Sequence, residues 1–265
     1  MILAQSLTAQ EIRVMTYNIR YDNPDDPYKW SQRKELIASQ VLFQEADVVG
    51  FQEALNHQNK DLQALLPEYS WTGVGRDDGK EKGEYCSIFY RKEAYELLGS
   101  GTIALSETPD IIGSRSWDAA LQRICSWVEL KDKKSNLHFF VFNTHFDHQG
   151  EIARQKSAEL LGKKIPEIAK NQAFVLLGDF NCDPLSEPFK VLSSVFNESA
   201  AKAMHKHGFP STYNGWTYQN ENPVIDHIFF SNHLKINYYT ILAEHFNGAF
   251  ASDHYPVISQ LSIKK

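Results

Sequence analysis

The sequence predicts an α/β fold in which a sandwich of mixed β-sheets is flanked by helices. Helical segments between buried strands suggest parallel crossovers, because two parallel strands need a long connection. The stretch 69–144 has few helical signals, which suggests antiparallel meanders. The chain shows no repeat, no low-complexity tract and no linker rich in Pro, Gly or Ser. We therefore expect one domain over residues 11–265.

Strands are predicted where short apolar or alternating runs are bounded by turn residues. In chain order they are 12–18, 47–52, 69–74, 85–91, 101–105, 123–130, 137–144, 173–178, 225–231, 234–242 and 255–263. Helices are predicted at 31–46, 56–66, 151–170 and 186–195. The first helix has Leu36, Ile37 and Val41 on one face. The last begins with Ser186 as N-cap and carries Pro188 in its first turn.

The composition is that of a globular protein, with 42% hydrophobic and 23% charged residues. No apolar run approaches the roughly 20 residues that cross a bilayer, so we expect no stable membrane insertion. A net charge of −6, from 27 basic and 33 acidic residues, argues against a general nucleic-acid binder. The three cysteines are expected to be buried free thiols, although a Cys86–Cys125 pair stays open.

Residues 1–10, M-I-L-A-Q-S-L-T-A-Q, lack the charged and apolar regions of a complete signal peptide. We interpret them as the remnant of one, with a frayed, disordered N-terminus as the alternative. The remnant interpretation predicts a secreted or periplasmic protein, and the alternative leaves a cytoplasmic one.

Polar side chains border most of the predicted strands. The apolar run at 173–177 leads into Gly178, Asp179 and Asn181, and the last two point the same way because side chains alternate along an extended chain. Other apolar runs are bordered by Asn18, Glu53, Asn143, His145, Asp226, Asp253 and His254. The pattern predicts one polar site at one rim of the sheet core.

Four of these residues are carboxylates, and together they indicate a metal site. Glu53, Asp179, Asp226 and Asp253 would repel one another if unpaired. An oxygen-rich site suits Mg²⁺ or Mn²⁺. With two histidines nearby to supply protons or positive charge, the set is typical of phosphate-ester hydrolysis by water.

The same residues carry a family resemblance. Six motifs occur in order and span almost the whole chain: M-T-Y-N-I-R at 15–20, F-Q-E at 51–53, N-T-H-F at 143–146, G-D-F-N at 178–181, I-D-H-I-F at 225–229 and S-D-H-Y-P-V at 252–257. The chain resembles the endonuclease/exonuclease/phosphatase superfamily. This resemblance implies a DNase I-like, four-layer α/β/β/α sandwich with mixed, mostly antiparallel sheets. The segments 106–110, 115–120 and 122–127 resemble a bacterial and fungal subgroup of uncharacterised function.

The resemblance also implies roles for the metal ligands. Glu53 is similar to the main ligand, with Asn18 beside it, and Asp253 is similar to a further ligand of the metal or of water.

Five residues take catalytic roles by the same resemblance. Asp179 is similar to the residue that orients or activates water, and Asn181 to its partner at the nucleophile or phosphate. His254 and His145 are similar to the phosphate-side histidines, and Asp226 orients His254. The identity of the formal base stays open.

Five further residues are candidates for substrate binding. Arg123 and Arg154 could bind phosphate or pair with an acid. His148 could contact substrate or only its own loop. Trp117 and Trp216 could stack on a base or sugar, or fill the core.

Two long loops, 22–30 and 106–122, are expected near the rim and could set specificity. Arg20 and Tyr21 follow the first motif and could line the pocket.

These observations predict a divalent-metal-dependent phosphoesterase, with a nuclease-like phosphodiesterase slightly preferred. The alternatives are a phosphomonoesterase acting on sugar, inositol or lipid phosphates, and a binding protein without catalysis. We expect a monomer whose partner is a phosphate-ester substrate: a nucleic acid, a phospholipid head group or a small metabolite.

Overall fold

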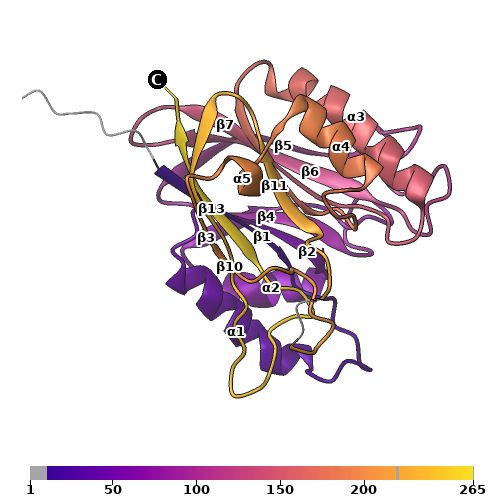
Figure 1. Ribbon diagram of the computed structural model, residues 1–265, viewed down its shortest axis with the longest axis vertical. Helices are drawn as coiled ribbons and strands as arrows, with labels where there is room; N and C mark the ends of the chain where they lie inside the picture. The colour runs from indigo at the N-terminus through magenta and orange to yellow at the C-terminus, as the bar shows by residue number, and fades with distance from the viewer. Residues whose placement is uncertain (1–10, 219–220, 265) are drawn as a thin grey trace, which may run out of the picture.

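A computed structural model describes residues 11–218 and 221–264 of the chain (Figure 1). Residues 1–10, interpreted above as a signal-peptide remnant or a frayed terminus, lie outside the described residues. Within the described part, no helix is long and apolar enough to cross a membrane.

The first sheet has the strand order β10-β12-β13-β1-β2-β4-β3. Its strands are β10 (His205–Gly208), β12 (Leu234–Ile241), β13 (Val257–Ile263), β1 (Glu11–Asn18), β2 (Val48–Ala54), β4 (Tyr85–Arg91) and β3 (Tyr69–Thr72). β1 is parallel to β2 and β10 to β12, whereas the other neighbours are antiparallel. The helices α1 (Trp30–Phe43) and α2 (Asn56–Leu65) cover its outer face (Figure 1).

The second sheet has the order β5-β6-β7-β8-β11-β9. Its strands are β5 (Tyr95–Ala104), β6 (Ile124–Asp132), β7 (His138–His145), β8 (Ala173–Asp179), β11 (Asp226–Phe230) and β9 (Asn197–Glu198). Only β7 and β8 run parallel. The helices α3 (Glu151–Ala169) and α4 (Glu187–Val195) cover its outer face, and the short α5 (Ser199–Lys202) follows β9.

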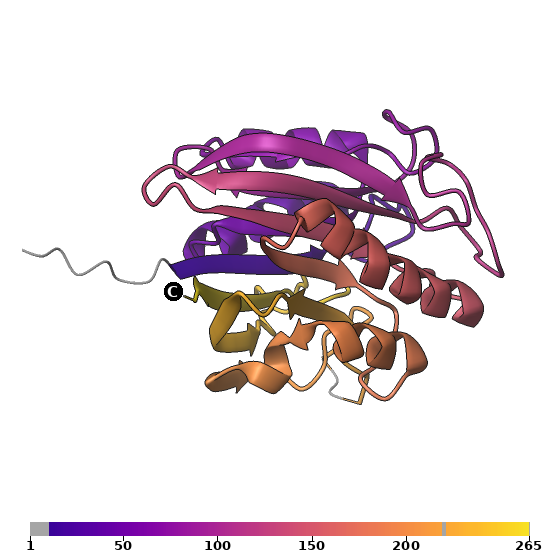
Figure 2. The ribbon, with the colours of Figure 1, turned by 90° about the horizontal axis from the view of Figure 1, so that it is seen from above.

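Three apolar layers hold this arrangement together. Val14, Val141 and Val175 belong to the layer between the sheets. Ile37 of α1 packs on the first sheet, and Leu161 of α3 packs on the second. The four-layer α/β/β/α sandwich with mostly antiparallel sheets is therefore confirmed. Figure 2 shows the strands of both sheets running side by side across the view, which brings strand ends to a common rim.

The four predicted helices are present, and so are strands at all the predicted places. The first difference is at β5, which begins at Tyr95 rather than near residue 101. Its residues 96–98 are exposed, so the segment lacks the alternation that marks a half-buried strand. The second is β10, where four exposed polar or glycine residues pair with β12 at the sheet edge. The elements β9 and α5 are too short for a periodic signal.

The cysteines are buried free thiols, and no Cys86–Cys125 bond forms.

A polar contact crosses between the sheets beside the apolar layer. Asn143 of β7 donates through Nδ2 to the carbonyl oxygens of Phe51 and Ser87, both at 2.9 Å. Its Oδ1 accepts from Gln52 Nε2 at 2.6 Å. Gly50 leaves room for this side chain, because a Cβ atom there would lie 2.7 Å from Asn143 Cγ.

This crowding makes a testable prediction for Gly50→Ala. The added methyl group must displace Asn143, so we expect the free energy of unfolding to fall by roughly 1–3 kcal/mol. Urea denaturation followed by circular dichroism measures the change.

Gly162→Ala is the matched control. Gly162 lies inside α3, and an added Cβ would meet only Val195 Cγ2 at 3.6 Å, an ordinary contact. Alanine favours helix, so this variant is expected to be as stable as the parent or up to about 1 kcal/mol more stable. An equal loss in both variants would contradict the interpretation of Gly50.

Candidate active site

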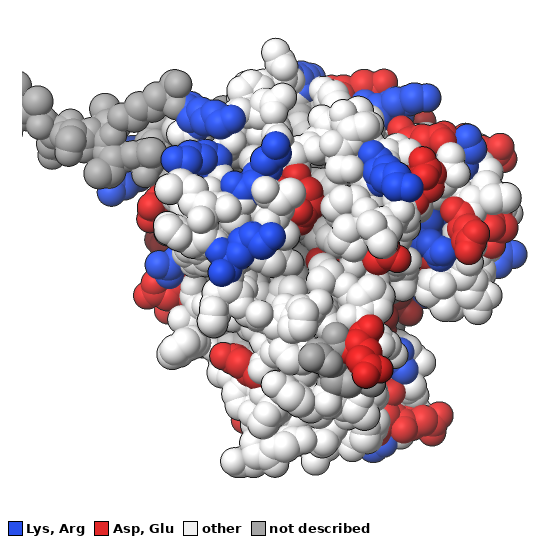
Figure 3. Space-filling model, viewed as in Figure 1, with Lys and Arg blue, Asp and Glu red and all other residues white. Residues whose placement is uncertain are grey.

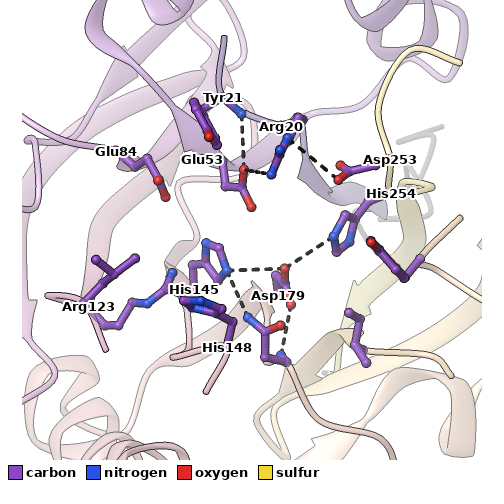
Figure 4. Close-up of a pocket in the computed structure, with 14 residues that line it drawn as sticks. Arg20, Tyr21, Glu53, Glu84, Arg123, His145, His148, Asp179, Asp253 and His254 are labelled. Carbon is purple, nitrogen blue, oxygen red and sulfur yellow. Dashed lines mark hydrogen bonds and ion pairs between the residues drawn. The ribbon is translucent and has the colours of Figure 1, made fainter. Parts of the chain in front are cut away.

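A pocket of about 500 Å³ lies where strand ends of the two sheets meet (Figure 4). It is lined by Arg20, Tyr21, Glu53, Glu84, Leu121, Arg123, His145, His148, Asp179, Asn181, Tyr213, Ile225, Asp253 and His254. The strand register accounts for its centre, because His145 of β7 and Asp226 of β11 both pair with Asp179 of β8. Most of the polar strand ends found in the sequence thus line one hollow. Asn18 and Asp226 bind lining residues from behind, and Asn143 lies between the sheets.

Asp179 ends β8 and is 1% exposed. Its Oδ1 accepts from the backbone N–H of Asn181 at 2.9 Å, and its Oδ2 accepts from Asn18 Nδ2 at 2.9 Å. Burial, followed by the charge of Asp226, raises the pKa of Asp179 to about 7. A carboxyl group with this pKa can take up or release a proton near neutral pH.

Asn18 links the two halves of the pocket. Besides Asp179 of the second sheet, its Nδ2 reaches Glu53 Oε1 of the first sheet at 3.0 Å. Its Oδ1 accepts from the backbone N–H of Arg20 at 3.0 Å. The group that faces the carboxylates is therefore the NH₂, which is a donor. Asn18 therefore bridges the two sheets through its NH₂, and the metal-ligand role that the resemblance implies for it stays a prediction.

Glu53 is turned into the pocket by an irregular backbone. The register of β2 on β4 shifts between Phe51 and Ala54, and Glu53 itself has a left-handed φ of 63°. Such a bulge re-aims a side chain at the end of a strand. Glu53 Oε2 then accepts from the backbone N–H of Tyr21 at 3.2 Å.

Arg20 lies between two of the acidic groups, as Figure 4 shows. Its guanidinium nitrogens are 3.8 Å from Glu53 Oε2 and 3.9 Å from Asp253 Oδ2, and Asp26 holds it at 2.9 Å. Burial is the main cause that raises the pKa of Asp253. Arg20 thus supplies positive charge at this end of the pocket.

His254 is a buried histidine that carries a charge. Its Nδ1 is 2.9 Å from Asp226 Oδ2, and its Nε2 is 3.8 Å from Asp179 Oδ2. Burial by itself would lower the pKa of His254, but the charges of Asp226 and Asp179 outweigh it and raise the pKa to about 10. The ring is therefore an imidazolium whose orientation is set by Asp226.

His145 has the opposite character. Its Nε2 lies 3.0 Å from Asn181 Nδ2, which also donates to the carbonyl oxygen of Phe146 at 3.0 Å. Because that amide nitrogen is the donor, Nε2 must accept, and the ring proton sits on Nδ1. Burial, followed by the charge of Arg123, lowers the pKa of His145 well below its usual value. His145 is thus neutral, whereas His254 is charged.

The structure adds pocket residues that sequence reasoning missed. Glu84 lines the wall that also contains Arg123, and Arg76 binds both oxygens of Glu84 at 2.6 and 2.9 Å. Tyr213 lines the opposite side, with its ring 5.1 Å from that of His254. Glu84 directly precedes β4, so the search for polar residues next to strands would have found it if strand starts had been included.

The candidates for substrate binding divide into two groups. Arg123 and His148 line the pocket, whereas Arg154, Trp117 and Trp216 are not among its lining residues. Arg154 Nη1 donates to the carbonyl oxygen of Asp147 at 2.9 Å. The ring of Trp216 packs against the guanidinium of Arg33, 5.4 Å from the ring centre. These contacts hold loops together and place the two side chains outside the pocket.

The endonuclease/exonuclease/phosphatase family model matches residues 15–254, which include every polar strand end described above. The chain belongs to this family. Members of the family hydrolyse phosphate esters, so the chain is an enzyme of this kind.

Similar proteins include both bacterial and animal members. A solved family structure from Bacteroides vulgatus is 39% identical, covers 96% of this chain and 100% of its own, and superposes with a TM-score of 0.93. A mannosyl-6-phosphatase from Bacteroides thetaiotaomicron is 37% identical over 95% and 100% of the two chains, with a TM-score of 0.91. Human nocturnin is 25% identical over 85% of this chain and 57% of its own length. The chain therefore spans little more than half of nocturnin.

The carboxylates of this family member fit a divalent cation. Glu53, Asp179 and Asp253 all face the pocket, and burial raises the pKa of the last two. Arg20 approaches Glu53 and Asp253 at distances near 4 Å, and the backbone N–H of Tyr21 donates to Glu53 Oε2 at 3.2 Å, so these carboxylates keep lone pairs for another cation. An all-oxygen donor set of this kind suits the hard divalent ions.

A second group could also hold a metal. Ligand atoms of Asp179, Asp226 and His254 lie within 4.8 Å of one another. His254 Nδ1 faces Asp226, and the ring could bind a metal through Nε2 only in its neutral form. Among the described residues, no other three acidic, histidine or cysteine side chains have ligand atoms this close, so one cation that binds Glu53, Asp179 and Asp253 together would require these side chains to move.

The charge on His254 makes a pH-dependent prediction. In the metal-free protein its imidazole is expected to stay protonated through pH 9, since the pKa is about 10. The pair then stabilises the fold fully below about pH 6.5, the ordinary pKa of histidine, and this contribution is lost as the pH rises through about 10. Asp226→Asn removes the main cause of the raised pKa, so His254 should titrate at lower pH.

Histidine side-chain NMR measures this titration, with His254→Gln to assign the signals. His227 is an internal reference, because burial lowers its pKa and its ring should stay neutral over the same range. The same midpoint for His254 in the parent and in Asp226→Asn would contradict the pairing.

Proposed function

We propose that the chain is a phosphomonoesterase that uses Mg²⁺ or Mn²⁺ and acts on a compact, hydroxyl-rich phosphate such as a hexose 6-phosphate. The observation that carries this proposal is the composition of the pocket wall. None of its lining residues is a lysine, and its two arginines, Arg20 and Arg123, both lie within 4 Å of carboxylates.

A nucleic-acid site usually needs unpaired lysines and arginines along the backbone of the ligand. On the face seen in Figure 3, basic and acidic side chains are interspersed. The net charge of −6 agrees with a small substrate. The mannosyl-6-phosphatase, 37% identical over nearly the full length of both chains, supports the choice of a sugar phosphate.

The metal would be held by Glu53 and Asp253, which leaves Asp179 free to act on water. When bound, it supplies positive charge that offsets the charge of the phosphate oxygens. The protein side chains supply the hydrogen-bond donor and the general base. His254 presents Nε2–H as a charged donor toward the pocket, and Asp226 fixes its direction. A charged donor of this kind stabilises charge that develops on the phosphate.

The attacking water needs a group that takes its proton. Asp179 is the best candidate, because its carboxyl oxygens lie at the pocket centre and its pKa is about 7. Asn18 and the Asn181 backbone hold the carboxylate in place through hydrogen bonds of 2.9 Å each. Positioned general bases commonly contribute about 10²–10⁴-fold to a rate.

Asp179→Asn is therefore expected to lower kcat at least about 100-fold, and EDTA should abolish activity. The assay is release of phosphate from mannose 6-phosphate with Mg²⁺ or Mn²⁺. Asp183→Asn is the matched control, because Asp183 is close in sequence but does not line the pocket. Unchanged turnover in Asp179→Asn would exclude it as base.

The ester preference is tested with p-nitrophenyl phosphate and bis-p-nitrophenyl phosphate. We expect the monoester to be cleaved with the higher kcat/KM. A higher value for the diester would overturn the proposal in favour of the nuclease-like phosphodiesterase that the sequence slightly favours.

A further inference from the structure

One wall of the pocket is built from a buried ion pair that plays no part in the chemistry above. Arg123, directly before β6, is 4% exposed, and its Nε lies 3.5 Å from Asp147 Oδ2. Asp147 is 1% exposed and accepts backbone N–H groups of Leu121, Gln149 and Gly150 at 3.1, 3.0 and 2.8 Å. These bonds fix Asp147, which holds the Arg123 guanidinium through Nε, while Arg123 Nη1 has no hydrogen-bond partner among the described residues.

Arg123 in turn fixes the proton of His148. Its Nη2 lies 3.0 Å from His148 Nδ1. A guanidinium can only donate, so Nδ1 accepts and the ring proton of His148 must sit on Nε2. Burial, followed by the charge of Arg123, also lowers the pKa of His148. His148 lines the pocket beside Arg123 as a neutral donor (Figure 4).

Glu84 supplies an acceptor on the same wall. Both its oxygens bind Arg76, yet each carboxylate oxygen can accept a further hydrogen bond. Within each ion pair, Arg76 with Glu84 and Arg123 with Asp147, the positive and negative charges offset each other when the carboxyl group is ionised, and burial followed by the charge of Glu53 raises the pKa of Glu84 to about 7. A second phosphate or a carboxylate on the substrate would therefore meet no net positive charge here, whereas a hydroxyl group can both accept from and donate to this wall.

We propose that this wall binds the uncharged, hydroxyl-bearing part of the substrate, with His148 Nε2–H donating to one hydroxyl oxygen and Glu84 accepting from a hydroxyl. Arg123 and Asp147 are positioning residues that hold His148 in this tautomer. The inference rests on the proposed phosphomonoesterase function and assigns the wall that selects a sugar over other leaving groups.

The test compares mannose 6-phosphate, which has hydroxyl groups, with p-nitrophenyl phosphate, which has none. For each variant the measured quantity is the ratio of kcat/KM for the first substrate to that for the second. His148→Ala is expected to lower this ratio about fivefold to tenfold, the usual effect of losing one neutral hydrogen bond. The loss should appear as a higher KM for the sugar phosphate.

His148→Gln is expected to recover part of the ratio, because its amide N–H can take the place of Nε2–H. Gln149→Ala is the matched control, since Gln149 is the exposed neighbour and does not line the pocket. Melting temperatures of all variants separate selectivity from stability.

Two results would overturn the inference, and they are distinguishable. A parent enzyme that cleaves both monoesters, with a ratio that His148→Ala leaves unchanged, contradicts the wall alone. A parent enzyme that cleaves neither monoester contradicts the proposed function and the inference with it.

Discussion

The active site forms only when the two sheets keep a fixed position relative to each other, because each sheet contributes half of the site residues. Glu53 and Asn18 belong to the first sheet, and Asp179 to the second. The Asn18 amide joins them with hydrogen bonds of 3.0 and 2.9 Å, and the Asn143 side chain ties β7 to β2 and β4 further inside. Apolar packing alone is not directional. The hydrogen bonds of these amides are directional, and they set the positions of Glu53 and Asp179 relative to each other.

Much of the site was predictable because a strand end is visible in sequence. Apolar runs stop where the backbone leaves the sheet, so Asp179, His145 and His254 could be found from one chain. The orientation of the side chains within the site was not predictable. Asn18 presents its NH₂ rather than its oxygen only because the Arg20 backbone occupies the other side. The position of Trp216 was not predictable either, because its contact with Arg33 joins segments that are far apart in the chain.

The fold itself was predicted more completely than the pocket. Buried strands and amphipathic helices carry periodic signals, so the layers followed from the pattern and the family resemblance. The wall formed by Glu84 and Arg76 has no such signal, because its residues come from an irregular loop whose path is set by hydrogen bonds and ion pairs. The wall proposed to select the substrate lies in this less regular part, which agrees with the tendency of loops on a rigid scaffold to carry function.

The pairing of β1 with β13 has a consequence for biosynthesis. Asn18 lies at the end of the first described strand, while Asp253 and His254 immediately precede the last strand. A chain emerging from the ribosome can fold much of the second sheet while the first still lacks β13. His254 follows every other residue that lines the pocket, so the pocket can be completed only after the segment before β13 has been synthesised. Nascent chains that lack this segment therefore lack the imidazole that faces Asp179.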